Sequence, residues 1–312
     1  MFSASFFIYN WHLLRYNSGV KRGGLMDFIF DDFDKLESKK KPLDKGNQFD
    51  NQLIRMGSAL AKQLHFSDSE EKLFALAISQ VDFFAQNEHI SVEIRVKDVQ
   101  EKLGLAEDGA FYTNLRKQYR NLAKKSYVEF DLGNEDNDFC DGFLLTGIHS
   151  NKRKGSLTID FNSRFKKSLQ YCKLAYTRVP LDDTLAYKSR FAIILQRYLT
   201  SLYRTGKENA QIQWFDFTTE QLKIIFGLSE QDYCYKSGKN KGKFKRTEFE
   251  KYTLQIACDE INSKSACMRI VDWEKERARG VIYYRIAVMI ATKIKKNPPV
   301  IDADIEEQLS LF

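Results

Sequence analysis

Apolar residues in the first half of the chain recur at helical spacing in some segments and alternate with polar residues in others. Ser67 and Glu70 have the spacing of a capping box, which predicts a helix with the apolar stripe Leu73, Phe74, Ala77, Ile78, Val81 and Phe84. Gly104 is expected to end a short helix. The predicted elements are this first helix, a strand over residues 91–96, the short helix over 97–103, a basic helix over 111–125, and strands over 127–132, 143–149 and 157–161.

The same order of elements recurs in the second half. A helix over residues 189–203 is predicted to face inward through Phe191, Ile194, Leu195, Tyr198 and Leu202. Thr218 and Gln221 cap a short helix that ends at Gly227, and Thr247 and Glu250 cap a longer one. The remaining predictions are a strand over 211–217, the end of the longer helix near Asn262, and a hairpin of residues 268–273 and 281–290 around a loop over 274–280.

Helix, strand, short helix, long helix and hairpin is the order of a winged helix-turn-helix. The glycine stops Leu103-Gly104-Leu105 and Phe226-Gly227-Leu228 lie at matching places, which indicates a duplication. The predicted fold class is α+β, with two tandem winged-helix (helix-turn-helix) domains. We expect a leader and flexible arm over residues 1–50, domains over 51–177 and 178–296, and a tail over 297–312, with the domain boundary near Arg178-Val179-Pro180.

Composition narrows the class of protein. A chain of 312 residues that is 43% hydrophobic can bury two ordinary cores, and its net charge of +7 favours a polyanionic partner. No apolar run is long enough to cross a membrane. The five cysteines form no C-x-x-C pair, which argues against a zinc site and a secreted disulfide framework and favours a reducing cytoplasm.

The first 25 residues match neither a signal peptide nor a domain. Their apolar residues precede the basic ones, the reverse of a signal peptide. Residues 21–26 can be encoded by AAA AGA GGA GGT TTA ATG, which contains a strong bacterial ribosome-binding site before an ATG. We therefore expect Met26 to be the start, with residues 1–25 a translated leader; a genuine N-terminal extension is the alternative.

The longer helix of the second half is the candidate for reading DNA, because the second helix of a helix-turn-helix enters the major groove. Its buried stripe is predicted to be Leu254, Ala257, Cys258 and Ile261, which leaves Lys251, Tyr252 and Gln255 facing outward. The alternative is a solvated helix face. We expect the basic run before this helix to contact phosphates, to form a mobile loop, or to do both. This run comprises Lys236, Lys239, Lys241, Lys243, Lys245 and Arg246.

Further basic residues are candidates for phosphate contacts. Lys275, Arg277 and Arg279 are expected at the tip of the second hairpin, where Glu274 and Glu276 dilute the charge. The candidates in the first half are Arg116, Lys117, Arg120 and Lys124 on one helix, followed by Lys125, and Lys152, Arg153 and Lys154 in a turn. A solvated surface is the alternative for each cluster. Arg190, Arg197 and Arg204 share a helix face and are interpreted as aiding solubility.

Sequence signals for an enzyme are poor. No Gly-Lys pair is followed by Ser or Thr, so no P-loop is seen. The four histidines are isolated, whereas a rolling-circle nicking enzyme needs two close together beside a nucleophilic tyrosine. Capping explains the Asp182-Asp183 pair. We therefore expect no catalytic residue, metal or cofactor.

The stretch from Leu53 to Ile290 resembles the initiator replication proteins of iteron-containing theta plasmids. The matching segments are Tyr176-Thr-Arg-Val-Pro-Leu, Lys188-Ser-Arg-Phe-Ala-Ile-Ile-Leu, Leu53-Ile-Arg-Met, Glu71-Lys-Leu-Phe-Ala-Leu-Ala-Ile, and residues 249–262, which resemble the family's recognition helix with its Glu-Ile-Asn end. The resemblance implies two winged helices, monomers bound to repeated origin sites (iterons), and dimers that repress the protein's own promoter. Family recognition helices often carry arginines where Glu250-Lys251-Tyr252 stand here; we expect the basic run to supply the missing charge.

The end of the chain carries a separate motif. Acidic residues follow Asn297-Pro-Pro299, and the last five residues resemble the pentapeptide by which bacterial proteins dock on the replicative sliding clamp. Leu311 and Phe312 would fill a hydrophobic cleft, with Leu309 beside them, while the Gln308 amide sets the register. An apolar end that packs on its own domain is the alternative.

Together these features predict a plasmid replication initiator without enzymatic activity. Its expected partners are double-stranded origin repeats, its own operator, the sliding clamp, the host helicase and host initiator, and a second copy of itself, with no membrane. A winged-helix transcriptional repressor without a replication role is the alternative, and a nicking-joining replicase is disfavoured by the missing histidine pair.

Overall fold

The computed structural model describes residues 47–50, 52–82, 88–105, 110–131, 139–169, 176–203 and 211–290. The predictions for the leader and arm up to residue 46, for Phe84 and Arg204, and for the tail over 297–312 lie outside the described residues. No helix among the described residues is long and apolar enough to span a membrane.

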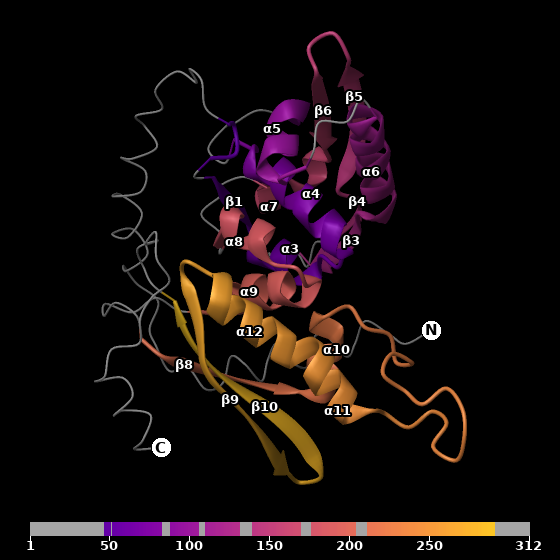
Figure 1. Cartoon of the computed structure of the whole chain (residues 1–312), viewed down its shortest axis with the longest axis vertical. Coiled ribbons are helices and arrows are strands. Elements are labelled where there is room, and N and C mark those ends of the chain that lie inside the picture. Colours follow the sequence, from indigo (N-terminus) through magenta and orange to yellow (C-terminus); the bar gives the residue numbers. More distant parts are fainter. Residues whose placement is uncertain are drawn as a thin grey trace. The chain divides into compact units, whose positions relative to one another are not determined.

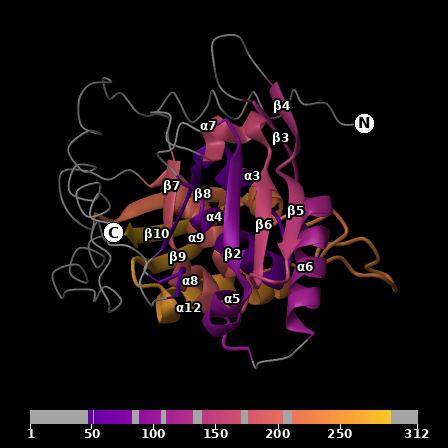
Figure 2. The same cartoon turned by 90° about the horizontal axis from the view of Figure 1, so that it is seen from above.

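The first half contains mixed helices and short antiparallel strands. Three of its strands form a sheet in the order β2-β6-β5, with helix α6 packed beside β5 (Figure 2). The elements are β1 (Leu53–Gly57), α3 (Ser58–Gln63), α4 (Asp68–Ser79), β2 (Ile90–Arg95), α5 (Val96–Lys102), α6 (Phe111–Lys125), β3 (Tyr127–Asp131), β4 (Phe139–Phe143), β5 (Leu145–Asn151), β6 (Ser156–Phe161), a 3-10 turn (Ser163–Phe165), α7 (Lys166–Leu169), β7 (Tyr176–Pro180) and α8 (Leu181–Ala186).

The second half repeats the arrangement. Its three strands have the order β8-β10-β9, which matches β2-β6-β5 position by position. The elements are α9 (Arg190–Leu202), β8 (Gln213–Thr218), α10 (Thr219–Ile225), α11 (Arg246–Phe249), a π-helical segment (Glu250–Gln255), α12 (Ile256–Lys264), β9 (Met268–Ala278) and β10 (Val281–Ile290) (Figure 1).

The two glycine stops also correspond. Gly104 ends α5 with φ 63°, and Gly227 follows α10 with φ 62°, a left-handed conformation that glycine adopts without a Cβ clash. The capping boxes at Ser67 and Thr218 are both present, as predicted. Each short helix is therefore stopped by local backbone chemistry before the longer helix of its half begins.

Buried apolar side chains form two separate clusters. The first extends from Phe49 to Leu181 and contains the predicted residues of α4, and the second extends from Tyr187 to Val288. Val179, next to the expected domain boundary, packs in the first cluster, because β7 pairs with β1. The chain passes from the first cluster to the second between Leu181 and Tyr187.

The pairing of β1 with β7 was not predicted. Ile54 lies opposite Val179, and Arg55 lies opposite Arg178. Both strands are five residues long, and β7 ends in proline, so their alternation is too short to distinguish them from loops. The predicted strand over residues 143–149 is confirmed from Leu145 onward as β5, whereas Phe143 ends a separate strand, β4, that was not predicted.

The second hairpin is longer than predicted. Strand β9 continues to Ala278, and Arg279 and Gly280 form the turn with φ 49° and 82°. Two positive φ values are typical of the type I′ turn, whose twist matches that of paired strands. The predicted hairpin is thus confirmed, but residues 274–278 are paired strand, so the predicted loop over 274–280 is reduced to Arg279 and Gly280.

The long helix of the second half begins before Thr247. Its N-cap is Lys245, and the backbone N–H of Phe249 donates to the Lys245 carbonyl at 3.0 Å. Thr247 therefore lies inside the first turn, and its predicted capping box with Glu250 was wrong. The helix runs from Arg246 to Lys264 and is interrupted by the π-helical segment.

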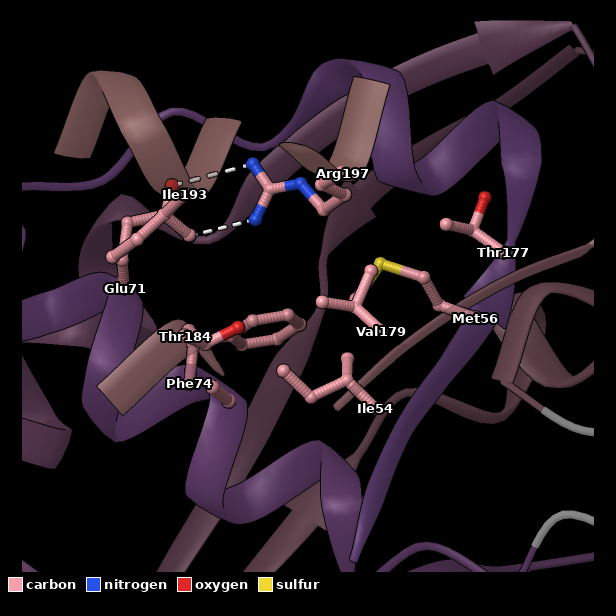
Figure 3. Close-up of a pocket in the computed structure, with 10 residues that line it drawn as sticks. Ile54, Met56, Glu71, Phe74, Thr177, Val179, Thr184, Ile193 and Arg197 are labelled. Atoms are coloured by element: carbon pink, nitrogen blue, oxygen red, sulfur yellow. Dashed lines mark hydrogen bonds and ion pairs between the residues drawn. The ribbon is translucent and has the colours of Figure 1, made fainter. Parts of the chain in front are cut away.

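Helix α9 contacts elements of both halves, including β7 of the first. It also contacts α3 and α12 (Figure 1). Its predicted inward residues Ile194 and Leu195 are buried, whereas Phe191, Tyr198 and Leu202 are only partly buried. Arg197, expected to be solvated, is 5% exposed and forms an ion pair with Glu71 of α4 at 2.7 Å (Figure 3). The buried position of Arg197 contradicts the role in solubility that its spacing predicted.

Candidate nucleic-acid interface

The long helix α11–α12 buries one face and exposes the other. Phe249 is fully buried, and its ring contacts the rings of Phe226, Tyr233, Phe244 and Tyr284 at centroid distances of 5.4–6.5 Å. The predicted stripe Leu254, Ala257, Cys258 and Ile261 is buried as well. The helix is thus anchored by one aromatic side chain that touches α10, the following loop and β10.

The outward residues of this helix differ from one another. Lys251 and Tyr252 are exposed, with the Lys251 ammonium 5.4 Å from the centroid of the Tyr252 ring. Gln255 is only half-exposed, and its amide donates to the Asp259 carboxylate at 2.8 Å. Lys251 and Tyr252 are therefore available to a ligand as they stand, whereas Gln255 would first have to leave Asp259.

The basic run before the helix forms a closed loop. The N–H of Tyr235 donates to Lys243 and that of Gly242 donates back to Tyr235, at 3.0 and 2.9 Å. Phe244 holds the loop against Phe249 at 5.4 Å, and the Lys223 ammonium lies 4.1 Å from the Phe244 ring centroid. The basic side chains that remain exposed are Lys236, Lys239, Lys241, Lys243 and Arg246.

Two lysines of the loop have partners of their own. Lys245 is half-buried, pairs with Glu248 at 3.0 Å, and lies 5.0 Å from the Tyr235 ring centroid. The Lys243 ammonium donates to Asn240 at 3.1 Å. Lys245 therefore stabilises the loop. The exposed lysines lie between residues 236 and 243.

The hairpin β9–β10, which we call the wing, separates its charges between two faces. Arg285 pairs with Glu274 and Glu276, each at 3.2 Å. Side chains alternate along a strand, so Lys275 and Arg277 face the opposite way. Lys275 pairs with Glu250 at 2.9 Å, while Arg277 and the turn residue Arg279 are exposed and make no ion pair with any described residue. Glu274 and Glu276 therefore do not dilute the charge of the face that carries Arg277.

The first half presents a comparable surface. In α6, Leu115, Tyr119 and Leu122 are buried, and the Tyr119 hydroxyl donates to the Leu73 carbonyl at 3.0 Å. The opposite face exposes Lys117, Arg120 and Lys124, with Arg116 half-buried. Lys125 instead pairs with Glu70 of α4 at 2.6 Å. Lys152, Arg153 and Lys154 are exposed in the turn between β5 and β6.

Two buried cysteine thiols of the second half lie in surroundings that favour their protonated form. Burial raises the pKa of the Cys258 thiol to about 12, and burial together with Asp183 raises the pKa of Cys267 further. Both thiols are thus kept protonated, which disfavours nucleophilic chemistry. Among the described residues, no group of three His, Cys, Asp or Glu side chains lies together as a metal site would require.

The pair of helix-turn-helix units, each followed by a hairpin, defines the class as a tandem winged-helix protein. Residues 49–200 match the family model described as Initiator Replication protein, WH1. This segment belongs to that initiator family, as the sequence resemblance predicted. The comparison with curated proteins finds no match.

One solved structure has a similar fold. A crystal structure of Pi initiator protein in complex with iteron DNA aligns with a TM-score of 0.54 at 16% identity, covering 78% of this chain and 99% of that one. This similarity confirms the predicted tandem winged-helix fold. Two structures of domains 2 and 3 of RctB align with TM-scores of 0.34 and 0.33 at 10% and 13% identity, covering 73% and 79% of this chain and 82% and 86% of those chains.

Proposed function

We propose that this chain initiates plasmid replication by binding repeated origin sites, or iterons, through both winged helices. The family match over residues 49–200 carries the proposal. The similarity in fold to an initiator solved with iteron DNA supports it, as do the exposed basic groups on corresponding elements of the two halves. We divide the described chain between Leu181 and Tyr187, so that each domain has its own apolar cluster.

In this proposal the helix Arg246–Lys264 is the recognition helix. It lies in the major groove, where Lys251 and Tyr252 contact base edges and Gln255 joins them after leaving Asp259. The exposed lysines of the loop 236–243 and the wing residues Arg277 and Arg279 contact phosphates on either side. In the first domain, α6 and the turn over 152–154 contact the phosphate backbone of a second stretch of DNA.

A binding assay tests the recognition helix. The double variant Lys251→Ala/Tyr252→Ala should bind a repeat from the plasmid origin about tenfold more weakly or worse, because a good base contact is worth roughly 1–3 kcal/mol. Binding to scrambled DNA of equal length should change much less. Lys188→Ala removes an exposed lysine outside the proposed interface and is the control. Equal losses on the two DNAs would assign these residues to phosphates rather than bases.

The proposal extends to partners of the replication machinery. The initiator would help open AT-rich DNA beside the repeats, recruit the host helicase and initiator, and repress its own promoter as a dimer. The terminal residues Gln308, Leu309, Leu311 and Phe312 would dock on the sliding clamp. Their acidic surroundings support a role away from DNA, because Asp302, Asp304, Glu306 and Glu307 would repel phosphates.

A pull-down tests the clamp motif. Leu311→Ala/Phe312→Ala should abolish capture of purified sliding clamp, since these two side chains are the proposed anchors. Val300→Ala/Ile301→Ala changes two apolar residues of the same tail outside the pentapeptide and should leave capture intact. Equal capture by both variants would show that Leu311 and Phe312 do not dock on the clamp.

A further inference from the structure

The carboxylate of Glu250 joins the recognition helix to both strands of the wing. It accepts from the Lys275 ammonium of β9 at 2.9 and 3.0 Å and from the Tyr284 hydroxyl of β10 at 2.9 Å. Lys275 and Tyr284 lie directly opposite each other in the register of the hairpin. One side chain of the helix therefore holds a cross-strand pair, and we call this contact the Glu250 clasp.

The surroundings of the clasp limit its freedom. The Glu250 side chain is 14% exposed, and Tyr284 is fully buried against Phe249 and Trp273, at 6.3 and 6.4 Å between ring centroids. A buried ring in a packed core has few alternative rotamers, so the Tyr284 hydroxyl is already directed at Glu250. The contact is thus more constrained than an ion pair between two solvated side chains, which contributes little.

The position of Glu250 within the helix adds to its effect. It begins the π-helical segment, and the two exposed residues that follow it are Lys251 and Tyr252. A π-helical turn changes the rotation of the helix at that point, and such turns occur frequently at functional sites. Holding Glu250 to the wing therefore sets the direction in which the next two side chains project.

The clasp also determines which wing charges can meet phosphates. Lys275 is neutralised by Glu250, whereas Arg277 lies two residues farther along the same face of β9 and is unpaired among the described residues. The free positive charge of the wing is thus moved away from the helix, to Arg277 and Arg279 near the turn.

We infer that Glu250 is a positioning residue for DNA specificity, which sets the angle between recognition helix and wing. Base contacts require this angle, because the side chains of Lys251 and Tyr252 must reach base edges while the wing contacts the DNA backbone. Non-specific binding needs only positive charge and tolerates a displaced wing. The inference rests on the proposed function, and it explains how an acidic residue can stand within a DNA-binding helix.

The test is a charge-neutral double variant. Glu250→Gln/Lys275→Gln removes the ion pair without altering net charge, and the full chain is titrated with an origin repeat and with a scrambled duplex. The ratio of the two affinities should fall about tenfold, since hydrogen bonds to charged groups are the strong ones. The affinity for scrambled DNA and its dependence on salt should remain within about twofold of the parent values.

Glu274→Gln/Arg285→Gln is the matched control. It also leaves the net charge unaltered, removes the ion pairs of Arg285 with Glu274, Glu276 and Asp216 on the opposite face of the same hairpin, and should preserve the affinity ratio. Tyr284→Phe keeps the aromatic packing and removes one hydrogen bond to Glu250, so it should lower the ratio by a smaller factor even if the double variant folds poorly.

The possible outcomes distinguish a failure of the proposed function from a failure of the inference about Glu250. A parent protein that binds both duplexes equally would contradict the proposed function itself. A parent that prefers the origin repeat, with an unchanged ratio in Tyr284→Phe and in a folded double variant, would overturn the clasp alone. Equal losses on both duplexes would also overturn it, because the pair would then serve general binding.

Discussion

Arg197 is the most fully enclosed charge on helix α9. Its guanidinium donates to Glu71 at 2.7 Å (Figure 3). It also donates to the carbonyls of Ala61 and Leu64 at 2.9 and 2.6 Å. The Glu71 carboxylate also accepts from the N–H of Phe66 at 3.1 Å. The two charges are thus satisfied by each other and by the backbone, and α9 of the second half is held to α3 and α4 of the first.

Replacing this arginine should destabilise the fold strongly. Arg197→Met leaves Glu71 without its partner in a buried site, and the expected loss is about 3–5 kcal/mol in the free energy of unfolding, measured by urea titration. Arg190→Met is the control on the same helix, because Arg190 is only partly buried and its side chain lies over the Phe191 ring. Similar losses for the two variants would show that the buried pair contributes nothing special.

His65 lies next to this pair and should make stability depend on pH. Desolvation, followed by the charges of Arg197 and Arg190, lowers the pKa of His65 from 6.5 to about 4. The unfolded chain then binds more protons than the folded chain between these values, so stability falls as the pH drops from 6.5 towards 4. Part of His65 remains accessible to solvent, so the effect is modest.

Unfolding titrations over this pH range test the effect. His65→Gln should flatten the loss of stability between pH 6.5 and 4.5, whereas His89→Gln, which removes an exposed imidazole, should leave it in place. A pH dependence that persists unchanged in His65→Gln would contradict the assignment.

At the scale of elements, the two helix-stopping glycines offer a matched comparison. Both have left-handed backbones, but a Cβ at Gly104 would meet no atom within 4 Å, while a Cβ at Gly227 would lie 2.7 Å from Cγ of His65. Gly104→Ala should therefore cost about 1–2 kcal/mol from backbone strain alone. Gly227→Ala should cost more, because the His65 ring or the α10 turn must also move.

Differential scanning calorimetry can separate the cost of backbone strain from the cost of the clash with His65. The extra cost of Gly227→Ala should disappear when it is measured in a His65→Ala background, where the obstructing ring is absent. Equal costs for the two glycine variants in the parent chain would show that the turn after α10 does not pack closely on His65.

The elements that could be predicted from sequence are those with local signals. The boxes at Ser67 and Thr218 are contained within four residues, and the limits of α6 follow from its apolar spacing. The pairing of β1 with β7 joins segments more than a hundred residues apart, and no local pattern marks it. The start of the long helix was misplaced because the Lys245 cap uses no side-chain signature.

The candidate site shows the same limit. The exposed positions of Lys251 and Tyr252 follow from helical periodicity, and those of Arg277 and Arg279 from their predicted place at the hairpin tip; the structure leaves all four exposed. The pairing of Lys275 with Glu250 depends on a contact between helix and hairpin 25 residues apart. Such a contact could not be predicted from charge pattern alone, which grouped Lys275 with its neighbours.

At the scale of the whole molecule, positive charge is concentrated on loops and helix faces of both halves. The closed loop 234–244 carries exposed Lys236, Lys239 and Lys241. If each contacts one phosphate, replacing all three with glutamine should reduce the slope of log affinity against log salt by about 0.9 per contact, or roughly 2.7. Filter binding at several salt concentrations measures this slope, and an unchanged slope would remove the loop from the interface.

The central claim is that two winged helices bind repeated origin sites. Nuclease footprinting of the full chain on the plasmid DNA beside its gene tests this most directly. We expect protection over several tandem direct repeats, spaced near whole turns of about 10.5 base pairs. Protection confined to a single inverted repeat, with the rest of the DNA unprotected, would contradict the claim and identify a repressor.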